Sequence, residues 1–163
     1  MLARESLLPK PEKDAREAMA LVGTLLRAVL AEPFLPLRSL PSMDIVRTHL
    51  HAEMAMETAE QFRVIFIDAS GHLLAEEIIS RGTLDETMMP PREIVQRALQ
   101  LGASSLILAH NHPSGSCEPS EADVRLTREL ARICGGLKIS VLDHIIVARP
   151  GCFSMSEHGY LAT

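Results

Sequence analysis

The stretch Leu106–Asp123, LILAHNHPSGSCEPSEAD, decides how the chain is organised. Its apolar start predicts a buried strand, since short apolar runs bounded by turn residues are typical of strands inside a sheet. His110 and His112 follow directly, and after a loop rich in proline and glycine a helix is expected to begin at Ser120. The pattern places two imidazoles at the end of a strand and a carboxylate, Asp123, in the first turn of a helix.

The helix start has an ordinary structural interpretation. The residues SEAD fit a capping box, in which Ser120 and Asp123 satisfy free amides of the first turn. However, Leu126, Leu130 and Ile133 follow Asp123 at helical spacing, which predicts that the carboxylate shares their inward face. A buried carboxylate is unfavourable unless it is paired or bound to a metal. The sequence therefore indicates a function for Asp123 beyond capping.

The two histidines are the candidate partners of this carboxylate. Side chains alternate along an extended segment, so His110 and His112 are expected to point to the same side. Two imidazoles and one carboxylate suit zinc, with a fourth position open as in catalytic sites. His110, His112 and Asp123 are therefore the predicted ligands of Zn²⁺.

These residues carry a resemblance to a known family. The pattern H-x-H, followed after seven residues by S-x-x-D, resembles the JAMM zinc motif of the MPN/JAB domain superfamily, which includes metallo-isopeptidases. More narrowly, the chain resembles the bacterial RadC family from about residue 42 to its C-terminus. The resemblance implies an α/β fold with a mixed sheet flanked by helices, of MPN/JAB, cytidine-deaminase-like architecture. The similar stretches are SRGTLDETMMPPREIVQRAL (80–99), HNHPSGSCEPSEAD (110–123) and LDHIIV (142–147).

The resemblance also implies an activity, that of a zinc-dependent metallopeptidase or isopeptidase-like amide hydrolase acting on a peptide or protein. In the superfamily a glutamate near the start of the first hairpin strand is the general base for the attacking water, and Glu60 occupies the matching position. Glu76 and Glu77 are the alternatives, because one of two consecutive strand residues must point inward. Ser120 is expected to donate a hydrogen bond to the oxyanion of the tetrahedral intermediate.

Composition limits the class of protein. A chain of 163 residues with 47% hydrophobic content is long enough for one well-packed domain and short for two. Three cysteines without a C-x-x-C pair indicate a reducing compartment. The apolar stretch 18–31 is interrupted by Arg27 and is too short to span a bilayer. We therefore expect a cytoplasmic protein without membrane contact, and the sequence leaves a homodimer open.

The chain divides into residues 1–41, an N-terminal helix with a proline-rich linker, and residues 42–163, a RadC-like JAB/MPN domain. Apolar residues recur at helical spacing over 11–31, and three prolines over 33–41 predict a stiff linker. RadC proteins typically carry a helix-hairpin-helix DNA-binding module ahead of the JAB domain. Residues 1–41 contain one glycine, Gly23, so this hairpin is not expected here. The net charge of −5 also argues against direct DNA binding.

Further elements are expected on either side of the metal motif. Ser42 is a candidate N-cap for a helix to about Met54, with His49 and His51 at its surface or edge. Alternating runs joined by ASG predict a hairpin of two strands. The expected helices and strands, with the residues expected to share one face of a helix, are: helix 42–54 (Ile45, Val46, His49, Leu50); strands 61–68 and 72–80; helix 91–101 (Ile94, Val95, Ala98, Leu99) ending at Gly102; helix 121–134; strands 138–148 and 152–155.

Several residues keep two interpretations. The Cys117 thiolate could reach the open zinc position, or Cys117 is only a small loop residue. Asp143 and His144 match an LDH signature of the family, and His144 is either a support for a metal ligand or a satisfied core histidine. Arg125, Arg128 and Arg132 share the helix face opposite Asp123 and are expected to be solvated.

Three functions remain in consideration: a zinc-dependent hydrolase, a catalytically silent metal-binding module for protein interaction, and a DNA-repair factor, as the family name implies. The intact ligand set with Ser120 favours the hydrolase, since a scaffold needs no open coordination position. Acidic charge counts against the repair factor. A nucleotide deaminase would require H-x-E and P-C-x-x-C, and neither motif is present.

Overall fold

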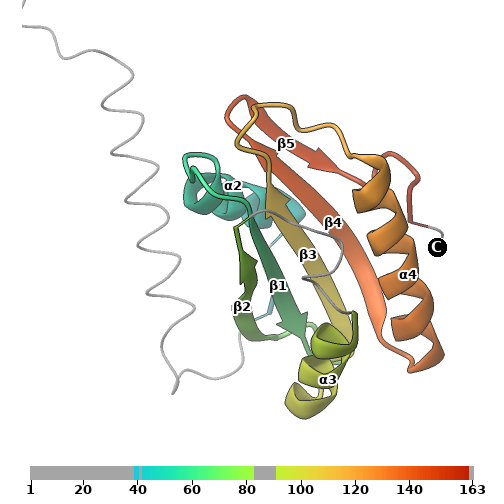
Figure 1. Ribbon diagram of the computed structural model, residues 1–163. Coiled ribbons are helices and arrows are strands. Elements are labelled where there is room, and N and C mark those ends of the chain that lie inside the picture. The colour runs from blue at the N-terminus through green and yellow to red at the C-terminus, as the bar shows by residue number, and fades with distance from the viewer. Residues whose placement is uncertain (1–38, 41, 83–90, 162–163) are drawn as a thin grey trace, which may run out of the picture.

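The computed structural model describes residues 39–40, 42–82 and 91–161, so the helix expected over 11–31 lies outside the described residues. It consists of one five-stranded mixed sheet, ordered β2-β1-β3-β4-β5, and three helices, which confirms the expected α/β class (Figure 1). None of the described helices combines the length and apolarity needed to cross a membrane. The elements are α2 (Met43–Met54), β1 (Gln61–Ile67), β2 (Leu73–Arg81), α3 (Pro91–Leu101), β3 (Ser105–Asn111), α4 (Glu121–Gly136), β4 (Ser140–Ala148) and β5 (Gly151–Ser154).

The β1–β2 hairpin forms as the sequence predicts. The Asp68 carboxylate accepts hydrogen bonds of 2.8 Å from the backbone N–H groups of Ser70 and His72, which closes the turn. Gly71 has a φ of +79°, a conformation that glycine adopts without a steric penalty. All seven residues of β1 are buried, because the strand lies inside the sheet with a layer on each face.

The strand directions determine where a site can form. β1 runs antiparallel to β2 and β3, whereas β3 and β4 are parallel and are connected through α4. The carboxyl ends of β3 and β4 therefore meet at one edge of the sheet, beside the N-terminus of α4 (Figure 1). Open α/β sheets bind ligands at such an edge.

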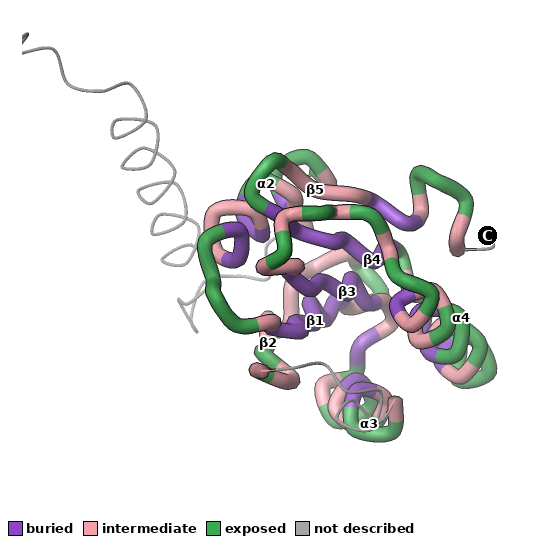
Figure 2. Tube along the Cα trace, turned by 45° about the horizontal axis from the view of Figure 1, so that its top comes forward, coloured by how far each residue is buried: buried purple, intermediate pink, exposed green. Residues whose placement is uncertain are grey.

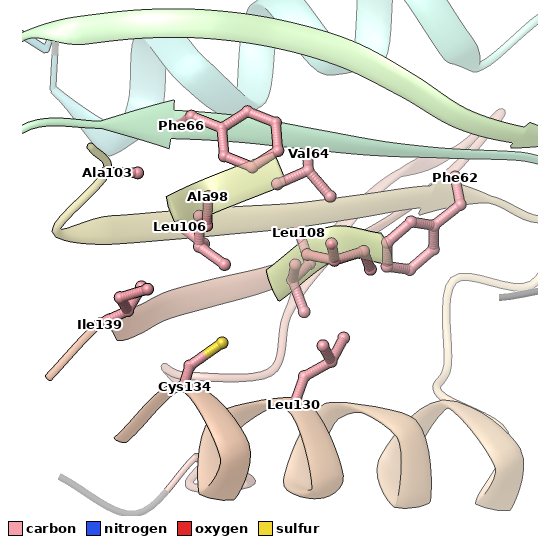
Figure 3. Close-up of a cluster of buried hydrophobic side chains, with 11 residues drawn as sticks. Phe62, Val64, Phe66, Ala98, Ala103, Leu106, Leu108, Leu130, Cys134 and Ile139 are labelled. Carbon is pink, nitrogen blue, oxygen red and sulfur yellow. The ribbon is translucent and has the colours of Figure 1, made fainter. Parts of the chain in front are cut away.

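Helices cover both faces of the sheet, with α3 and α4 on one face and α2 on the other (Figure 1). The strands form the buried centre and the helices expose their outer faces (Figure 2). Leu130 and Cys134 point from α4 towards the strands, where Phe62 and Leu108 contribute to the same apolar cluster (Figure 3). Burial of this cluster fixes α4, and with it Asp123, against the sheet.

Several residues differ from their expected positions on the helices. Ile45 is 45% exposed and Leu99 is 56% exposed, because each lies one position off the stripe that its helix buries. His49, expected at the surface or edge, is buried, since its Nε2 lies 2.7 Å from the Glu76 carboxylate. Ile133 is only partly buried. The inward stripe of α4 consists of Asp123, Thr127, Leu130 and Cys134, with Leu126 packed at its edge.

Candidate metal centre

The end of β3 places two imidazoles side by side. His110 is fully buried in β3, and His112 lies just beyond the strand. The backbone N–H of His112 donates a 2.8 Å hydrogen bond to Val147 O, so the chain continues extended along β4 past the end of β3. The two Nε2 atoms lie 2.8 Å apart, which confirms that both rings point to the same side.

The first turn of α4 supplies the carboxylate. Ser120 Oγ accepts a 3.1 Å hydrogen bond from the Asp123 N–H, and Asp123 Oδ2 accepts 2.7 Å hydrogen bonds from both Ser120 N–H and Ser120 Oγ–H. The same carboxylate faces the histidines, with Oδ1 3.1 Å from His110 Nε2 and Oδ2 3.5 Å from His112 Nε2. The capping box therefore orients the Asp123 carboxylate towards the imidazoles, so capping and a metal role are compatible.

Electrostatics keep this carboxylate ionised. Burial by itself raises the pKa of Asp123, but hydrogen bonds from His110, His112 and Ser120 outweigh it and hold that pKa well below its usual range. The hydrogen bond to Asp123 in turn raises the pKa of His112, and the charge of Glu60 adds a smaller contribution in the same direction. The centre thus combines a permanent negative charge with nitrogen donors.

The donor set fits a metal ion. One potential ligand atom from each of His110, His112 and Asp123 lies within 4.8 Å of the other two, the single such group among the described residues. Two imidazole nitrogens and one carboxylate oxygen match the three protein ligands of catalytic zinc sites. The structure therefore brings together the three residues that the sequence selected, in an arrangement that could hold a metal.

His144 lies directly behind His110. Its Nε2 is 2.8 Å from His110 Nδ1, and its Nδ1 is 2.6 Å from Thr127 Oγ1. Burial, followed by the charge of His110, lowers the pKa of His144 well below its ordinary value, so this imidazole is neutral. The sequence left open whether His144 supports a metal ligand or is a satisfied core histidine. The structure is compatible with both, because His144 is buried with both ring nitrogens in hydrogen-bond contact and one of these contacts is with the candidate ligand His110.

Asp143, the neighbour of His144, has a different environment. Its Oδ2 accepts a 2.6 Å hydrogen bond from Ser154 Oγ–H, and its Oδ1 accepts hydrogen bonds from the backbone N–H groups of His144 and Ser156, at 2.7 and 2.9 Å. These contacts join β4 to β5 and to the turn that follows it. Asp143 therefore stabilises the backbone around His144 and is not in the metal group.

The pairing of β1 with β3 indicates that Glu60 lies near His112. β1 and β3 pair antiparallel with Phe62 opposite His110, and continuing this register places Glu60 opposite His112. The electrostatic effect of Glu60 on the pKa of His112 agrees with that placement.

Asn111, which is 1% exposed, forms hydrogen bonds with the backbone on both sides of Glu60, and the sequence analysis did not predict this role. The alternation of side chains along a strand could have identified Asn111, because it predicts that Asn111 points to the opposite face of the sheet from His110 and His112.

The two alternative glutamates are engaged in other ion pairs. Glu76 contacts His49 on α2 and Arg63 on β1, with a 2.9 Å distance between Arg63 Nη1 and Glu76 Oε1. Glu77 accepts hydrogen bonds from Arg97 on α3, the shortest at 2.6 Å. Each of these two carboxylates is therefore bound by residues outside the metal group.

The remaining sequence candidates lie outside the centre. Cys117 is partly buried and is not part of the metal group found in the described portion of the chain. Another cysteine, Cys152, has a thiol whose pKa is raised to about 11 by burial and, to a smaller extent, by Cys117. Arg125, Arg128 and Arg132 are exposed, as expected for a solvated face. Arg125 lies 3.7 Å from Glu121 in the preceding turn.

Comparison with known proteins finds a matching family and a similar protein. A family model described as the RadC-like JAB domain matches residues 40–160. UPF0758 protein Reut_A2732 of Cupriavidus pinatubonensis is 42% identical over 142 residues, which make up 87% of this chain and 62% of that protein. The chain therefore spans less than two thirds of the length of this relative.

Proposed function

The chain belongs to the RadC-like JAB domain family, and from this membership we propose that it is a zinc-dependent amide hydrolase of the metallopeptidase or isopeptidase type. The observation that carries the proposal is the convergence of His110, His112 and Asp123 within 4.8 Å, with Glu60 beside His112. Three protein ligands leave a zinc ion one open position, which a hydrolase uses for chemistry.

Three side chains would bind the ion. His110, His112 and Asp123 would bind it through two nitrogens and one oxygen. When bound, zinc supplies Lewis acidity, which polarises a carbonyl and increases the acidity of water. Asp123 is already ionised in the fold, so it needs no deprotonation before it binds a cation.

Glu60 and Ser120 would handle the proton and the developing charge. Glu60 accepts a proton from the attacking water and returns it to the leaving amine nitrogen. Ser120 Oγ–H donates to Asp123 Oδ2 in the structure, and a hydroxyl hydrogen can rotate about its Cβ–Oγ bond. After that rotation Ser120 can donate to the oxyanion of the tetrahedral intermediate. A peptide or an isopeptide-linked protein is the proposed substrate.

A metal-binding interaction module without turnover is the second candidate. One observation favours it, since the single hydroxyl hydrogen of Ser120 already donates to Asp123 Oδ2 within the capping box of α4. In such a module Ser120 would serve only to orient Asp123 and begin the helix.

Metal analysis and peptide profiling separate the two functions. The purified chain, loaded with Zn²⁺, is assayed against a peptide library, together with Glu60→Gln, Asp123→Ala and the control Glu57→Gln. Glu57 is an exposed glutamate near Glu60, so its variant should keep both metal and activity. We expect Glu60→Gln to keep the metal and lose about 10² to 10⁴ in rate, and Asp123→Ala to lose both. Stoichiometric zinc without turnover of any peptide would assign the interaction module instead.

A further inference from the structure

Three hydrogen-bonded contacts run in series behind His110. His110 Nδ1 lies 2.8 Å from His144 Nε2, and His144 Nδ1 lies 2.6 Å from Thr127 Oγ1. Thr127 Oγ1 in turn lies 2.5 Å from the backbone carbonyl oxygen of Asp123, one turn earlier in α4. The residues His110, His144 and Thr127 are each 0% exposed, so no bulk water competes for these contacts.

The carbonyl at the end of this series sets the direction of every hydrogen bond. A carbonyl oxygen only accepts, so Thr127 Oγ–H must donate to Asp123 O, since two acceptor oxygens would otherwise face each other at 2.5 Å. The hydroxyl has one hydrogen, and its other neighbour, the Met155 sulfur at 3.5 Å, is a weak acceptor. Thr127 Oγ therefore accepts the hydrogen bond from His144, which must carry its proton on Nδ1.

The same logic extends to the metal ligand. A neutral imidazole with its proton on Nδ1 has a lone pair on Nε2. His144 Nε2 therefore accepts a hydrogen bond from His110, which must carry a proton on Nδ1. The His110 nitrogen that faces Asp123 and His112 is Nε2. Because this Nε2 lies 3.1 Å from Asp123 Oδ1, it can carry a second proton in the metal-free chain, and once that proton leaves it has the lone pair that a metal requires.

We propose that Thr127 and His144 form a relay, anchored at the Asp123 carbonyl, that fixes the tautomer of His110 with Nε2 free for the metal. Both are positioning residues, because they act on the ion only through His110. The proposal rests on the proposed zinc centre and deepens it. Asp123 then contributes to the site in two ways. Its side chain is a ligand, and its backbone carbonyl is the acceptor from which the relay starts.

The tautomers can be read directly by nitrogen-15 NMR of the imidazole rings in the full chain, metal-free and loaded with Zn²⁺. In both states we expect His144 with a protonated Nδ1 and a bare Nε2, and His110 with a protonated Nδ1. A proton on His144 Nε2 in the wild-type chain would overturn the relay. This NMR measurement does not depend on whether the protein has hydrolase activity.

A pair of variants at Thr127 tests whether the relay affects the metal. Thr127→Val keeps the shape and removes the acceptor for His144 Nδ1–H, so His144 should shift its proton to Nε2 and leave the His110 proton on its metal-facing nitrogen. We expect Zn²⁺ affinity, measured by competition with a chromophoric chelator, to fall about 10- to 100-fold. Thr127→Ser keeps a hydroxyl and should restore the wild-type tautomers and most of the affinity.

The outcomes separate this inference from the proposed function. Wild-type chain without Zn²⁺ affinity would refute the zinc centre, whereas the metal-free spectra would still decide the tautomers. If Thr127→Val lowers the unfolding temperature but keeps the wild-type tautomers and affinity, Thr127 has only a packing role and the relay is wrong. His144→Gln provides a second variant should Thr127→Val fail to fold, and it too should lose affinity.

Discussion

The Asn111 side chain clamps the backbone on both sides of Glu60. Asn111 Oδ1 accepts a 2.8 Å hydrogen bond from Gln61 N–H, and Asn111 Nδ2 donates a 3.1 Å hydrogen bond to Ala59 O. Because Asn111 stands between His110 and His112 in the sequence, the proposed base and two proposed ligands are tied to one short segment. Rigid placement of a base relative to the reacting atoms is a large part of catalytic rate.

Replacement of Asn111 should therefore affect rate more than metal binding. We expect Asn111→Ala to lower kcat by about 100-fold, since small displacements of a catalytic group have effects of this size. The Zn²⁺ affinity should stay close to that of the wild type, because both histidines remain in place. Steady-state kinetics on the best library peptide, alongside chelator competition, provide the two measurements. Unchanged kcat in a folded Asn111→Ala chain would show that the clamp is not needed.

Ser120→Ala should weaken both the helix start and the metal centre. The variant removes the hydroxyl that accepts from Asp123 N–H and donates to Asp123 Oδ2, at 3.1 and 2.7 Å. Loss of an N-cap side chain lowers the free energy of unfolding by about 1 kcal/mol. Urea unfolding of the metal-free chain measures this, and Ser120→Thr, which keeps the hydroxyl, is the matched control. Equal stability of the alanine and threonine variants would contradict a capping role.

The Glu76 ion pair should make stability depend on acidity. Burial alone raises the pKa of Glu76, but His49 and Arg63 outweigh it and lower that pKa from its ordinary value of 4.5. A carboxyl whose pKa is lower in the folded state stabilises the fold above its unfolded pKa. This stabilisation is lost as the pH falls below about 4.5 through the folded pKa.

Glu76→Gln should accordingly be less stable than the wild type by about 1 to 3 kcal/mol at pH 7, since Arg63 loses a buried charged partner. The difference should shrink as the pH is lowered towards 3. Glu77→Gln is the control, because the Glu77–Arg97 pair is 30% and 40% exposed and should contribute about 1 kcal/mol or less. Urea unfolding across this pH range gives the comparison. A difference between wild type and Glu76→Gln that does not vary with pH would refute the assignment.

Cys117→Ser should leave the metal centre unchanged. Cys117 is not in the metal group, which among the described residues consists of His110, His112 and Asp123. The cobalt-substituted wild type and variant should therefore have the same absorption, without a thiolate charge-transfer band. Disappearance of such a band in Cys117→Ser would mean that the loop brings the thiol to the ion.

Short-range patterns in the sequence were sufficient for much of the fold and for three residues of the centre. Alternation predicted that His110 and His112 point to one side, and helical spacing predicted that Asp123 faces inward, both of which the structure confirms. The capping box and the ASG turn also formed as expected. Each of these features depends on backbone geometry within a few residues, which local sequence encodes directly.

Only the tertiary structure decided the partners of these residues. The contact between His110 and His144 joins residues 34 apart, through the parallel pairing of β3 and β4. The ion pairs of Glu76 and Glu77 depend on how α2 and α3 pack on the sheet. Strand register and helix docking are set by burial summed over the whole core, so no local motif specifies which distant side chains meet.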